Sequence, residues 1–225
     1  TEYIRALIRS DSKIKPMTVK RHKAGYHDRN LYQNIASATK LREMKRNNEN
    51  INDFIPYKLE DIDCDIPYDI SNLDSAIISK LRLMTAEDLQ NISEVTEGIE
   101  NRILSSANMS YSFETLVENV KNKRYTTSKI RRMIISALIG FTKDIYSPMP
   151  QYIRILGMNK VGMTILKQAK DICKVPIITK TADFKEQSPQ FNLDVRATNI
   201  AILCNPIPTH RIGNADLKKS PIIMK

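Results

Sequence analysis

The sequence predicts a protein of mixed class, α/β plus α, in which an α/β segment, a helical domain and a small α/β segment follow one another. Apolar residues recur at helical spacing through residues 73–141. Short β-branched runs, PMTVKR and QYIRIL, stand before and after that region as candidate strands. Prolines and changes in composition separate the parts.

In the front segment we expect a helix over residues 2–9, a strand over residues 16–21 and a helix over residues 36–46. Pro16 takes the first position of the expected strand, where a missing N–H is tolerated, and β-branched residues follow it. The second helix begins after a basic loop that contains Gly25.

A polar and then acidic connector follows the second helix and marks the best domain boundary. It contains Pro56, Pro67 and a cluster of acids, namely Glu60, Asp61, Asp63 and Asp65. Alternating acids in a loop are usually solvated, so we expect no metal site there. The expected division is residues 1–50, a connector over 51–72, a helical domain over 73–147 and a C-terminal α/β segment over 148–225.

Helix starts within the helical domain are predicted from capping residues. Thr85 precedes AEDL, and Thr96 or Glu97 precedes GIENRIL. Ser112 forms a capping pattern in which Thr115 replaces the usual acid. A further helix begins at residue 126 or 127, and short connections make a compact bundle.

Residues 151–179 are predicted to form a βαβ-like unit, in which QYIRIL and VPIIT are strands and KVGMTILKQAKDI is the helix. Gly157 and Gly162 lack the spacing of a dinucleotide-binding fingerprint, so we interpret GMNKVG as a tight turn. A last helix is expected over residues 192–203, and a Pro-rich tail follows in extended conformation.

The formal net charge of +10 and the pI of about 9.5 indicate a polyanionic partner, either nucleic acid or an anionic membrane. No apolar run approaches the roughly 20 residues needed to span a bilayer, so we expect no membrane-spanning segment. We expect nucleic acid and no membrane as the partner. Cys64, Cys173 and Cys204 are far apart and form no CxxC pair. This pattern fits a reducing cytoplasm and does not fit a structural zinc site.

The densest group of cations lies in KNKRYTTSKIRR, residues 121–132, which contain no acid and place Tyr125 in the middle. Such a surface favours RNA phosphates, and the tyrosine ring could stack on a base. The alternative is a solvated helix face, which usually carries mixed charge. The expected RNA contacts are Lys121, Lys123, Arg124, Tyr125, Lys129, Arg131 and Arg132.

A candidate phosphate site lies between Lys20 and Arg42. We expect Ser37 and Thr39 in the first turn of the helix, and Arg42 one turn later, so that hydroxyls, a guanidinium and free N–H groups converge. The alternative is a capped surface helix with a basic face.

The loop before that helix also contains cations and histidines. Arg21 is assigned to a nucleotide phosphate because it lies with Lys20 and Lys23 beside the helix that begins with Ser and Thr. His22 and His27 flank Gly25. We interpret them as hydrogen-bonding or structural residues in preference to catalytic ones.

The ordered set KRHKAGYHD, IASATKLR, TEGIENRIL, KNKRYTTSKIRRMII, YIRILGMNKVG and PIITK resembles the bacterial tRNA(Met) cytidine acetate ligase family over nearly the whole chain. The resemblance implies an enzyme that uses ATP, with Mg²⁺, to activate acetate as acetyl-adenylate. Such an enzyme then acetylates N4 of the wobble cytidine of elongator tRNA(Met). In that family a Rossmann-like nucleotidyltransferase domain carries an HxGH-type motif, and the helical and C-terminal parts help to hold the tRNA.

The resemblance implies that residues 1–50 end the nucleotidyltransferase domain, with strand 16–21 a remnant of its sheet, and that 73–147 bind tRNA. It matches Arg21 to an ATP-contacting arginine and Ser37, Thr39 and Arg42 to the phosphate motif. His22 is placed with them.

The family's HxGH motif and an ATP-contacting Asn are expected just before Thr1 and are not in this sequence. We therefore expect the 225 residues alone to make no acetyl-adenylate while retaining the tRNA-binding parts. Two alternatives stay open, a non-catalytic RNA-binding module and another small-substrate adenylyltransferase. The catalytic residues, metal ligands, oligomeric state and bases read are not assigned.

Overall fold

A computed structural model describes most of the chain, which divides into two compact units, Thr1–Pro67 and Tyr68–Lys225. Regular structure is mostly helical in both units. The described residues are 2–20, 22–23, 25, 28–56, 68–96, 98–146, 149–185 and 188–224.

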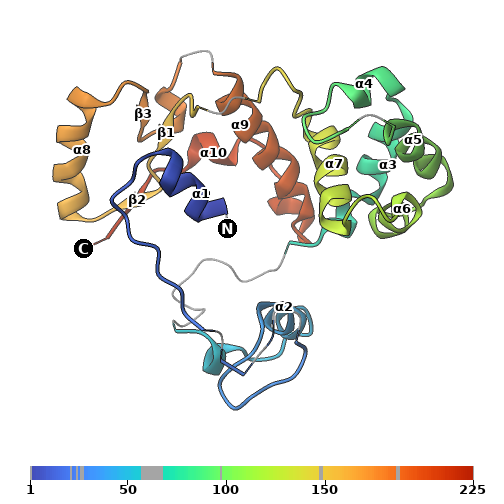
Figure 1. Ribbon diagram of the computed structural model, residues 1–225, viewed down its shortest axis with the longest axis horizontal. Helices are drawn as coiled ribbons and strands as arrows, with labels where there is room; N and C mark the ends of the chain where they lie inside the picture. The colour runs from blue at the N-terminus through green and yellow to red at the C-terminus, as the bar shows by residue number, and fades with distance from the viewer. Residues whose placement is uncertain are drawn as a thin grey trace. The chain divides into compact units, whose positions relative to one another are not determined.

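The first unit contains α1 (Glu2–Arg9), α2 (Ala38–Arg46) and a 3-10 turn, Asn52–Phe54 (Figure 1). The helix predicted over residues 2–9 is confirmed, although α1 buries none of its residues. Ser37 is the N-cap of α2, so the predicted start at residue 36 was early.

The strand predicted over residues 16–21 is wrong for its described part, because residues 12–20 carry no regular structure. Met17 and Val19 are each 88% exposed. A strand is stable only when its backbone N–H and C=O groups pair with a neighbour, and among the described residues no segment pairs with this one. β-branched residues alone did not make a strand here.

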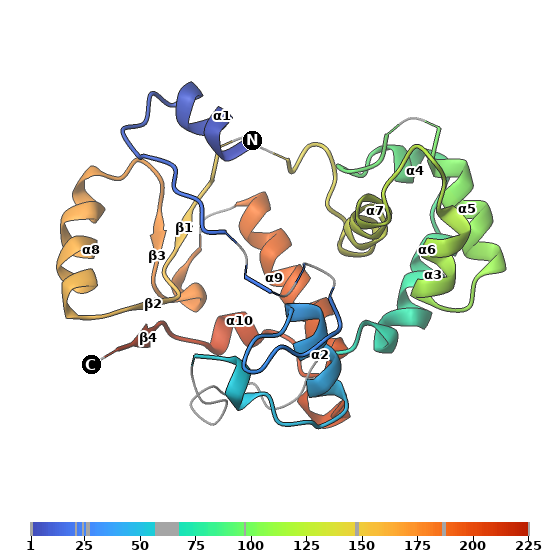
Figure 2. The same ribbon diagram turned by 60° about the horizontal axis from the view of Figure 1, so that its bottom comes forward.

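The second unit begins with a bundle of short helices (Figure 1, Figure 2). Its members are α3 (Asp74–Arg82), α4 (Ala86–Gln90), α5 (Glu100–Met109), α6 (Phe113–Val120) and α7 (Thr127–Ile139). Predicted caps are confirmed at Thr85, which forms a capping box with Asp88, and at Ser112, which forms one with Thr115.

The start predicted at Thr96 or Glu97 is wrong for Thr96, and Glu97 lies outside the described residues. Helix α5 begins at Glu100 after Ile99, which offers no side-chain cap. The Glu100 carboxylate instead accepts hydrogen bonds from the Gly98 amide at 2.8 Å and from Gln90 Nε2 at 3.1 Å. A side chain inside the first turn therefore takes the place of the usual capping residue.

The core of the bundle forms where the apolar faces of α3, α5, α6 and α7 meet. Its most buried side chains include Ile77, Leu81, Ile103, Leu116, Ile130 and Met133. Cys204 joins this core from the far end of the sequence, and its carbonyl accepts a hydrogen bond from the Asp69 amide at 2.9 Å. The C-terminal region therefore packs back on the start of the bundle.

The βαβ unit predicted over residues 151–179 is confirmed. Strands β1 (Ile153–Arg154) and β3 (Ile177–Ile178) are parallel, and α8 (Lys160–Ile172) connects them. Helix α8 has the predicted bounds, and the Asn159 side chain caps it by accepting from the Gly162 amide at 2.9 Å.

A second parallel pair joins β2 (Gly157–Met158) to β4 (Ile222–Ile223). The interpretation of GMNKVG as a tight turn was therefore wrong, because Gly157 belongs to a strand and Gly162 to α8. The tail is also less extended than predicted, since it contains α10 (Ala215–Lys218) before β4. Residues 222–223 pair with residues 157–158, and this long-range contact is invisible to local patterns.

Helix α9 (Pro189–Ala201) lies between the α/β part and the bundle of the second unit (Figure 1, Figure 2). It begins three residues before the predicted start, with Ser188 as N-cap. Arg196 Nη1 donates to the Ile139 carbonyl at the end of α7 at 3.0 Å. Gly140 follows in the left-handed conformation, with φ of +70°, which favours glycine; a Cβ there would lie 2.8 Å from that Nη1, so the arginine side chain would have to shift.

Candidate functional site

The loop before α2 is organised by Asp28. Its Oδ1 accepts from the Asn30 amide at 2.9 Å, and its Oδ2 accepts from the Tyr32 hydroxyl at 2.8 Å. These hydrogen bonds, the Asn30 amide first, lower the pKa of the Asp28 carboxyl. The sequence alone suggested no role for Asp28, although an Asp two residues before an amide partner is a common turn signal.

Ser37 closes this loop on α2 and has little capacity left for a ligand. Its hydroxyl donates to the Asp28 carbonyl and accepts from the Lys40 amide at 3.1 Å, and the residue is 2% exposed. Ser37 is therefore a cap and not a hydroxyl open to a phosphate. Thr39 is half-buried, and Arg42, one turn later, is exposed. These two lie at i and i+3, which is one face of the helix.

The other predicted phosphate residues precede this loop. His22 is exposed, and Arg21 and His27 lie outside the described residues. The amides at the start of α2 have no partner within the helix, apart from the Lys40 amide that Ser37 caps. The structure thus keeps Thr39 and Arg42 together with the start of α2, whose first amides have no partner among the described residues, and it removes the Ser37 hydroxyl from the set.

The basic segment 121–132 is held rigidly where α6 ends and α7 begins. Arg102 donates to the carbonyls of Asn119, Val120 and Lys121 at 2.8–3.0 Å. Asn122 Oδ1 accepts from the amides of residues 124 and 125 at 2.8 and 3.0 Å, which makes an Asx turn. Thr126 caps α7, as predicted.

Half of the predicted RNA-contacting cations are paired with carboxylates. Arg131 pairs with Glu114, Arg132 with Glu94 at 3.6 Å and Lys121 with Glu118 at 3.3 Å. Lys123, Arg124 and Lys129 have no carboxylate partner within the part of the chain that is described. The sequence interpretation counted acids only within residues 121–132. It therefore missed the glutamates of α6 and of the loop before α5, which pair with these cations in the folded protein.

Tyr125 is a core residue, which corrects the expectation that its ring stacks on a base. The residue is 8% exposed, and its hydroxyl is 2.7 Å from Thr96 Oγ1. Arg124 and Lys129 lie over the ring, 5.4 and 5.3 Å from its centroid. The ring therefore positions two cations of the basic surface, with no face open to RNA.

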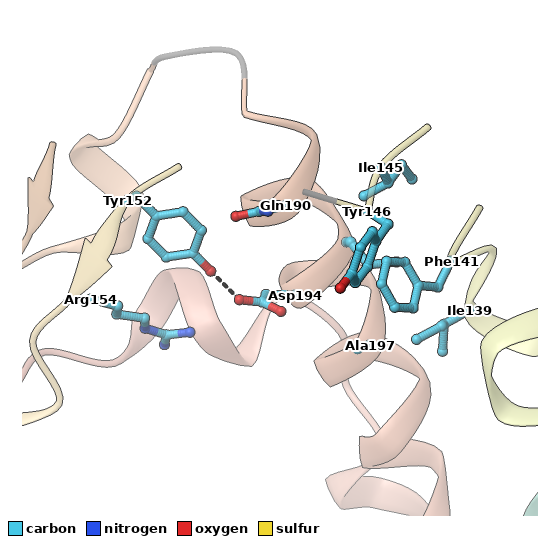
Figure 3. Close-up of a pocket in the computed structure, with 10 residues that line it drawn as sticks. Ile139, Phe141, Ile145, Tyr146, Tyr152, Arg154, Gln190, Asp194 and Ala197 are labelled. Carbon is cyan, nitrogen blue, oxygen red and sulfur yellow. Dashed lines mark hydrogen bonds between the residues drawn. The ribbon is translucent and has the colours of Figure 1, made fainter. Parts of the chain in front are cut away.

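A pocket of about 640 Å³ lies in the second unit, next to the end of α7 (Figure 3). Its floor is one face of α9, formed by residues 190, 193, 194 and 197 at helical spacing. One wall carries Tyr152 and Arg154 from the β1 region. The other comes from the end of α7 and the segment that follows it, and it carries Ile139, Phe141, Ile145 and Tyr146.

The polar side of this pocket is a linked set of charges. The Tyr152 hydroxyl donates to Asp194, and burial together with this bond raises the pKa of Tyr152, which stays protonated. Arg154 Nη2 pairs with Asp216 Oδ1 at 2.7 Å. Burial alone would raise the pKa of Asp216, but the hydrogen bonds from Arg154 and Thr198, together with the charge of Arg154, outweigh burial and lower the pKa.

Sequence reasoning did not single out these pocket residues. The alternation in QYIRIL places residues 152 and 154 on one side of a strand, and this was the available signal. Their acidic partners, Asp194 and Asp216, are 42 and 62 residues away in the sequence.

The described ranges contain neither a metal cluster nor a membrane-spanning helix. No group of three or more His, Cys, Asp or Glu side chains there is placed to hold a metal ion. Over the same residues, no helix combines the length and apolar character needed to cross a bilayer. The acidic cluster at residues 60–65 lies outside the described residues.

The sequence is similar to proteins named tRNA(Met) cytidine acetate ligase. That of Thermosipho africanus (strain TCF52B) is 33% identical over 253 residues, which cover 100% of this chain and 60% of that protein. That of Clostridium botulinum (strain Loch Maree / Type A3) is 33% identical over 236 residues, which cover 100% of this chain and 56% of that protein. The chain thus spans less than two thirds of the length of these relatives.

Solved structures agree with this similarity. The crystal structure of apo Thermotoga maritima TmcAL (form I) matches with a TM-score of 0.84 and 28% identity, over 99% of this chain and 59% of that one. The structure of the same protein bound with alpha-thio ATP matches with a TM-score of 0.80 and 27% identity, over 99% and 58% of the two chains. The fold is thus nucleotidyltransferase-like. The model of the HIGH Nucleotidyl Transferase family matches residues 1–216, and the chain therefore belongs to that family.

Proposed function

We propose that this chain is the portion of a tRNA(Met) cytidine acetate ligase that completes an ATP site and holds the tRNA. The complete protein would use ATP and acetate to form N4-acetylcytidine at the wobble position of elongator tRNA(Met). Support comes from relatives that carry this name and align with the whole chain, and from a similar structure with a bound ATP analogue. In this proposal residues 1–50 belong to the ATP-binding domain, and residues 73–147 bind tRNA in the cytoplasm.

In the first proposed step, an acetate oxygen attacks the α-phosphorus of ATP. The new P–O bond gives acetyl-adenylate, and pyrophosphate leaves. Negative charge grows on the phosphate oxygens, so cationic and N–H donors lower the barrier. Thr39, Arg42 and the free amides of α2 would supply such donors, with Arg21 and His22 from the preceding loop. The Mg²⁺ that would accompany ATP is implied by the family, and no protein ligand is assigned to it.

In the second step, N4 of the cytidine attacks the acetyl carbon, AMP leaves and the amine loses a proton. This requires the base to leave its stack and the tRNA to be held close. Lys123, Arg124 and Lys129 would contact RNA phosphates directly. Lys121, Arg131 and Arg132 would do so only in competition with their carboxylate partners.

The feature that carries the ATP part of this proposal is Arg42, exposed one turn beyond the open start of α2. The test replaces Arg42 by Ala in the complete protein and measures acetate-dependent exchange of pyrophosphate into ATP. Loss of one such donor should lower the rate about a hundredfold. Arg46→Ala, at the other end of the same helix, is the matched control and should leave the rate unchanged. Equal rates for the two variants would refute the assignment.

A second measurement concerns the 225-residue chain by itself. Its sequence contains no HxGH tetrad, so this polypeptide alone should show no exchange. Robust acetate-dependent exchange by the 225-residue chain would overturn that expectation.

Mass spectrometry of tRNA(Met) incubated with the complete protein, ATP and acetate should show acetylcytidine. Its absence would favour a non-catalytic RNA-binding module or an adenylyltransferase with another substrate.

A further inference from the structure

The basic surface at the start of α7 continues into two pockets that share one aromatic residue. The first is the 640 Å³ pocket on α9, and the second, of about 340 Å³, includes Lys129 and Lys143 in its lining. Tyr146 lines both pockets and is 62% exposed. Proteins that bind single-stranded RNA combine such cations with an open aromatic face. Tyr125, which the sequence suggested for this role, is buried.

We propose that the pocket on α9 receives one unstacked nucleobase of the RNA, whose ring stacks on Tyr146. This inference rests on the proposed function, because it supplies a base-binding site for the RNA that the ligase would hold. The adjoining phosphate lies in the second pocket beside Lys129 and Lys143. Glu94 also lines that pocket, but its carboxylate pairs with Arg132 at 3.6 Å and so does not stand there as an isolated negative charge.

The size and lining of the first pocket suit a base. Its volume lies within the range of about 300–1,000 Å³ typical of sites for small ligands. Phe141 supports the Tyr146 ring, with 6.4 Å between the centroids and 44° between the planes. Ile139, Ile145 and Ala197 complete an apolar surface for the faces of the base (Figure 3).

The polar edge of the pocket indicates which bases fit. Asp194 lies on the floor and is exposed, and its Oδ2 accepts from Tyr152 while the carboxylate retains further acceptor capacity. A carboxylate accepts hydrogen bonds from an exocyclic amine, such as N4 of cytosine. Uracil has no such amine. The pocket therefore favours amino-bearing bases over uracil.

The test measures binding of the 225-residue chain to fluorescein-labelled RNA by anisotropy. One probe is a hairpin with a single-stranded cytidine loop, the second has a uridine loop, and the third is a duplex with the same number of phosphates. Tyr146→Ala should weaken binding of the cytidine hairpin on the order of tenfold and leave the duplex unchanged. The unsubstituted chain should bind the cytidine hairpin more tightly than the uridine hairpin.

Three further variants separate stacking from charge and from folding. Tyr146→Phe keeps the ring and should bind like the unsubstituted chain. Tyr111→Ala is the matched control, because Tyr111 is 82% exposed in the same unit and lines neither pocket. Lys143→Ala should reduce the slope of log affinity against log salt by about one, whereas Tyr146→Ala should leave that slope unchanged.

Different failures have different meanings. If the chain binds no RNA, both the RNA part of the proposed function and this inference are wrong. If it binds the hairpins but Tyr146→Ala behaves like Tyr111→Ala, or weakens duplex and hairpin equally, this inference alone is wrong. Equal affinity for the cytidine and uridine loops would refute the role of Asp194 in base selection.

Discussion

Replacing Asp216 by Asn should destabilise the unit Tyr68–Lys225 by breaking its most buried ion pair among the described residues. Asp216 lies in α10, and its partner Arg154 lies in β1, so the pair joins the tail to the sheet. The Thr181 hydroxyl donates to the Asp216 carbonyl, which holds the helix in place. The substitution keeps the size of the side chain and removes its charge, which leaves the guanidinium without its partner.

The magnitude follows from the exposure of the two side chains, which is 22% for Arg154 and 11% for Asp216. An exposed ion pair contributes about 0–1 kcal/mol to the free energy of unfolding. Removing one partner of a fully buried pair lowers that free energy by about 3–5 kcal/mol. The Arg154 side chain retains some contact with water, so we expect a loss of about 2–3 kcal/mol. For a unit of this size the midpoint of thermal unfolding should fall by about 5–10 °C.

The loss should depend on pH with a defined sign. Because the pKa of Asp216 is lowered in the folded state, its carboxylate stabilises the fold fully above the unfolded pKa of about 4. That contribution disappears as the pH falls through the lower, folded pKa. The difference in unfolding free energy between the two proteins should be constant from about pH 5 to 8 and should shrink below about pH 4.

Thermal unfolding followed by circular dichroism measures these differences. Glu118→Gln is the control, since its pair with Lys121 has side chains 63% and 51% exposed and should contribute less than about 1 kcal/mol. The double variant Arg154→Met/Asp216→Asn should be more stable than Asp216→Asn alone, because no charge is left buried. Two results would contradict the reasoning. One is an equal loss of stability in Asp216→Asn and Glu118→Gln, and the other is a difference in stability between Asp216→Asn and the unsubstituted protein that grows as the pH falls.

Three further outcomes follow from contacts described above. Ser37→Ala should cost about 1–2 kcal/mol and speed hydrogen exchange in α2, since it removes the cap and the bond to the loop; unchanged exchange would contradict this. Arg124→Ala should lower tRNA affinity and reduce the slope of log affinity against log salt by about one. Arg131→Ala removes an ion-paired cation and should change that slope less. Filter binding at several salt concentrations compares the two variants. Tyr125→Phe should cost about 1 kcal/mol through the lost contact with Thr96 and leave RNA affinity unchanged, and weaker RNA binding at unchanged melting temperature would restore Tyr125 as a contact.

Features with local causes were predictable from the sequence. The caps at Ser112 and Thr126 and the bounds of α8 follow from residues within a few positions of each helix end. Helical periodicity and capping act over one or two turns, so a single sequence contains them. The parallel pairing of β1 and β3 was also within reach, because residues 151–179 show the strand–helix–strand pattern of a βαβ unit.

Features that need distant partners were not predictable. The expected strand at residues 16–21 depended on pairing that its described residues do not have, whereas β2 was missed because its partner β4 lies more than 60 residues later. Within the candidate sites, Glu94 and Glu114 neutralise arginines of α7 from outside the basic segment. The burial of Tyr125 likewise depends on Thr96 and on the packing of the whole bundle.

The contact between Arg196 and the last carbonyl of α7 has a mechanical consequence. It fastens the helix that floors the larger pocket to the segment that carries Tyr146. Gly140 has no Cβ, so the guanidinium can lie close to the backbone there, and moving α9 away from this segment would stretch that bond. The bond thus helps to hold floor and wall together before any ligand arrives, which reduces the ordering entropy lost when one enters.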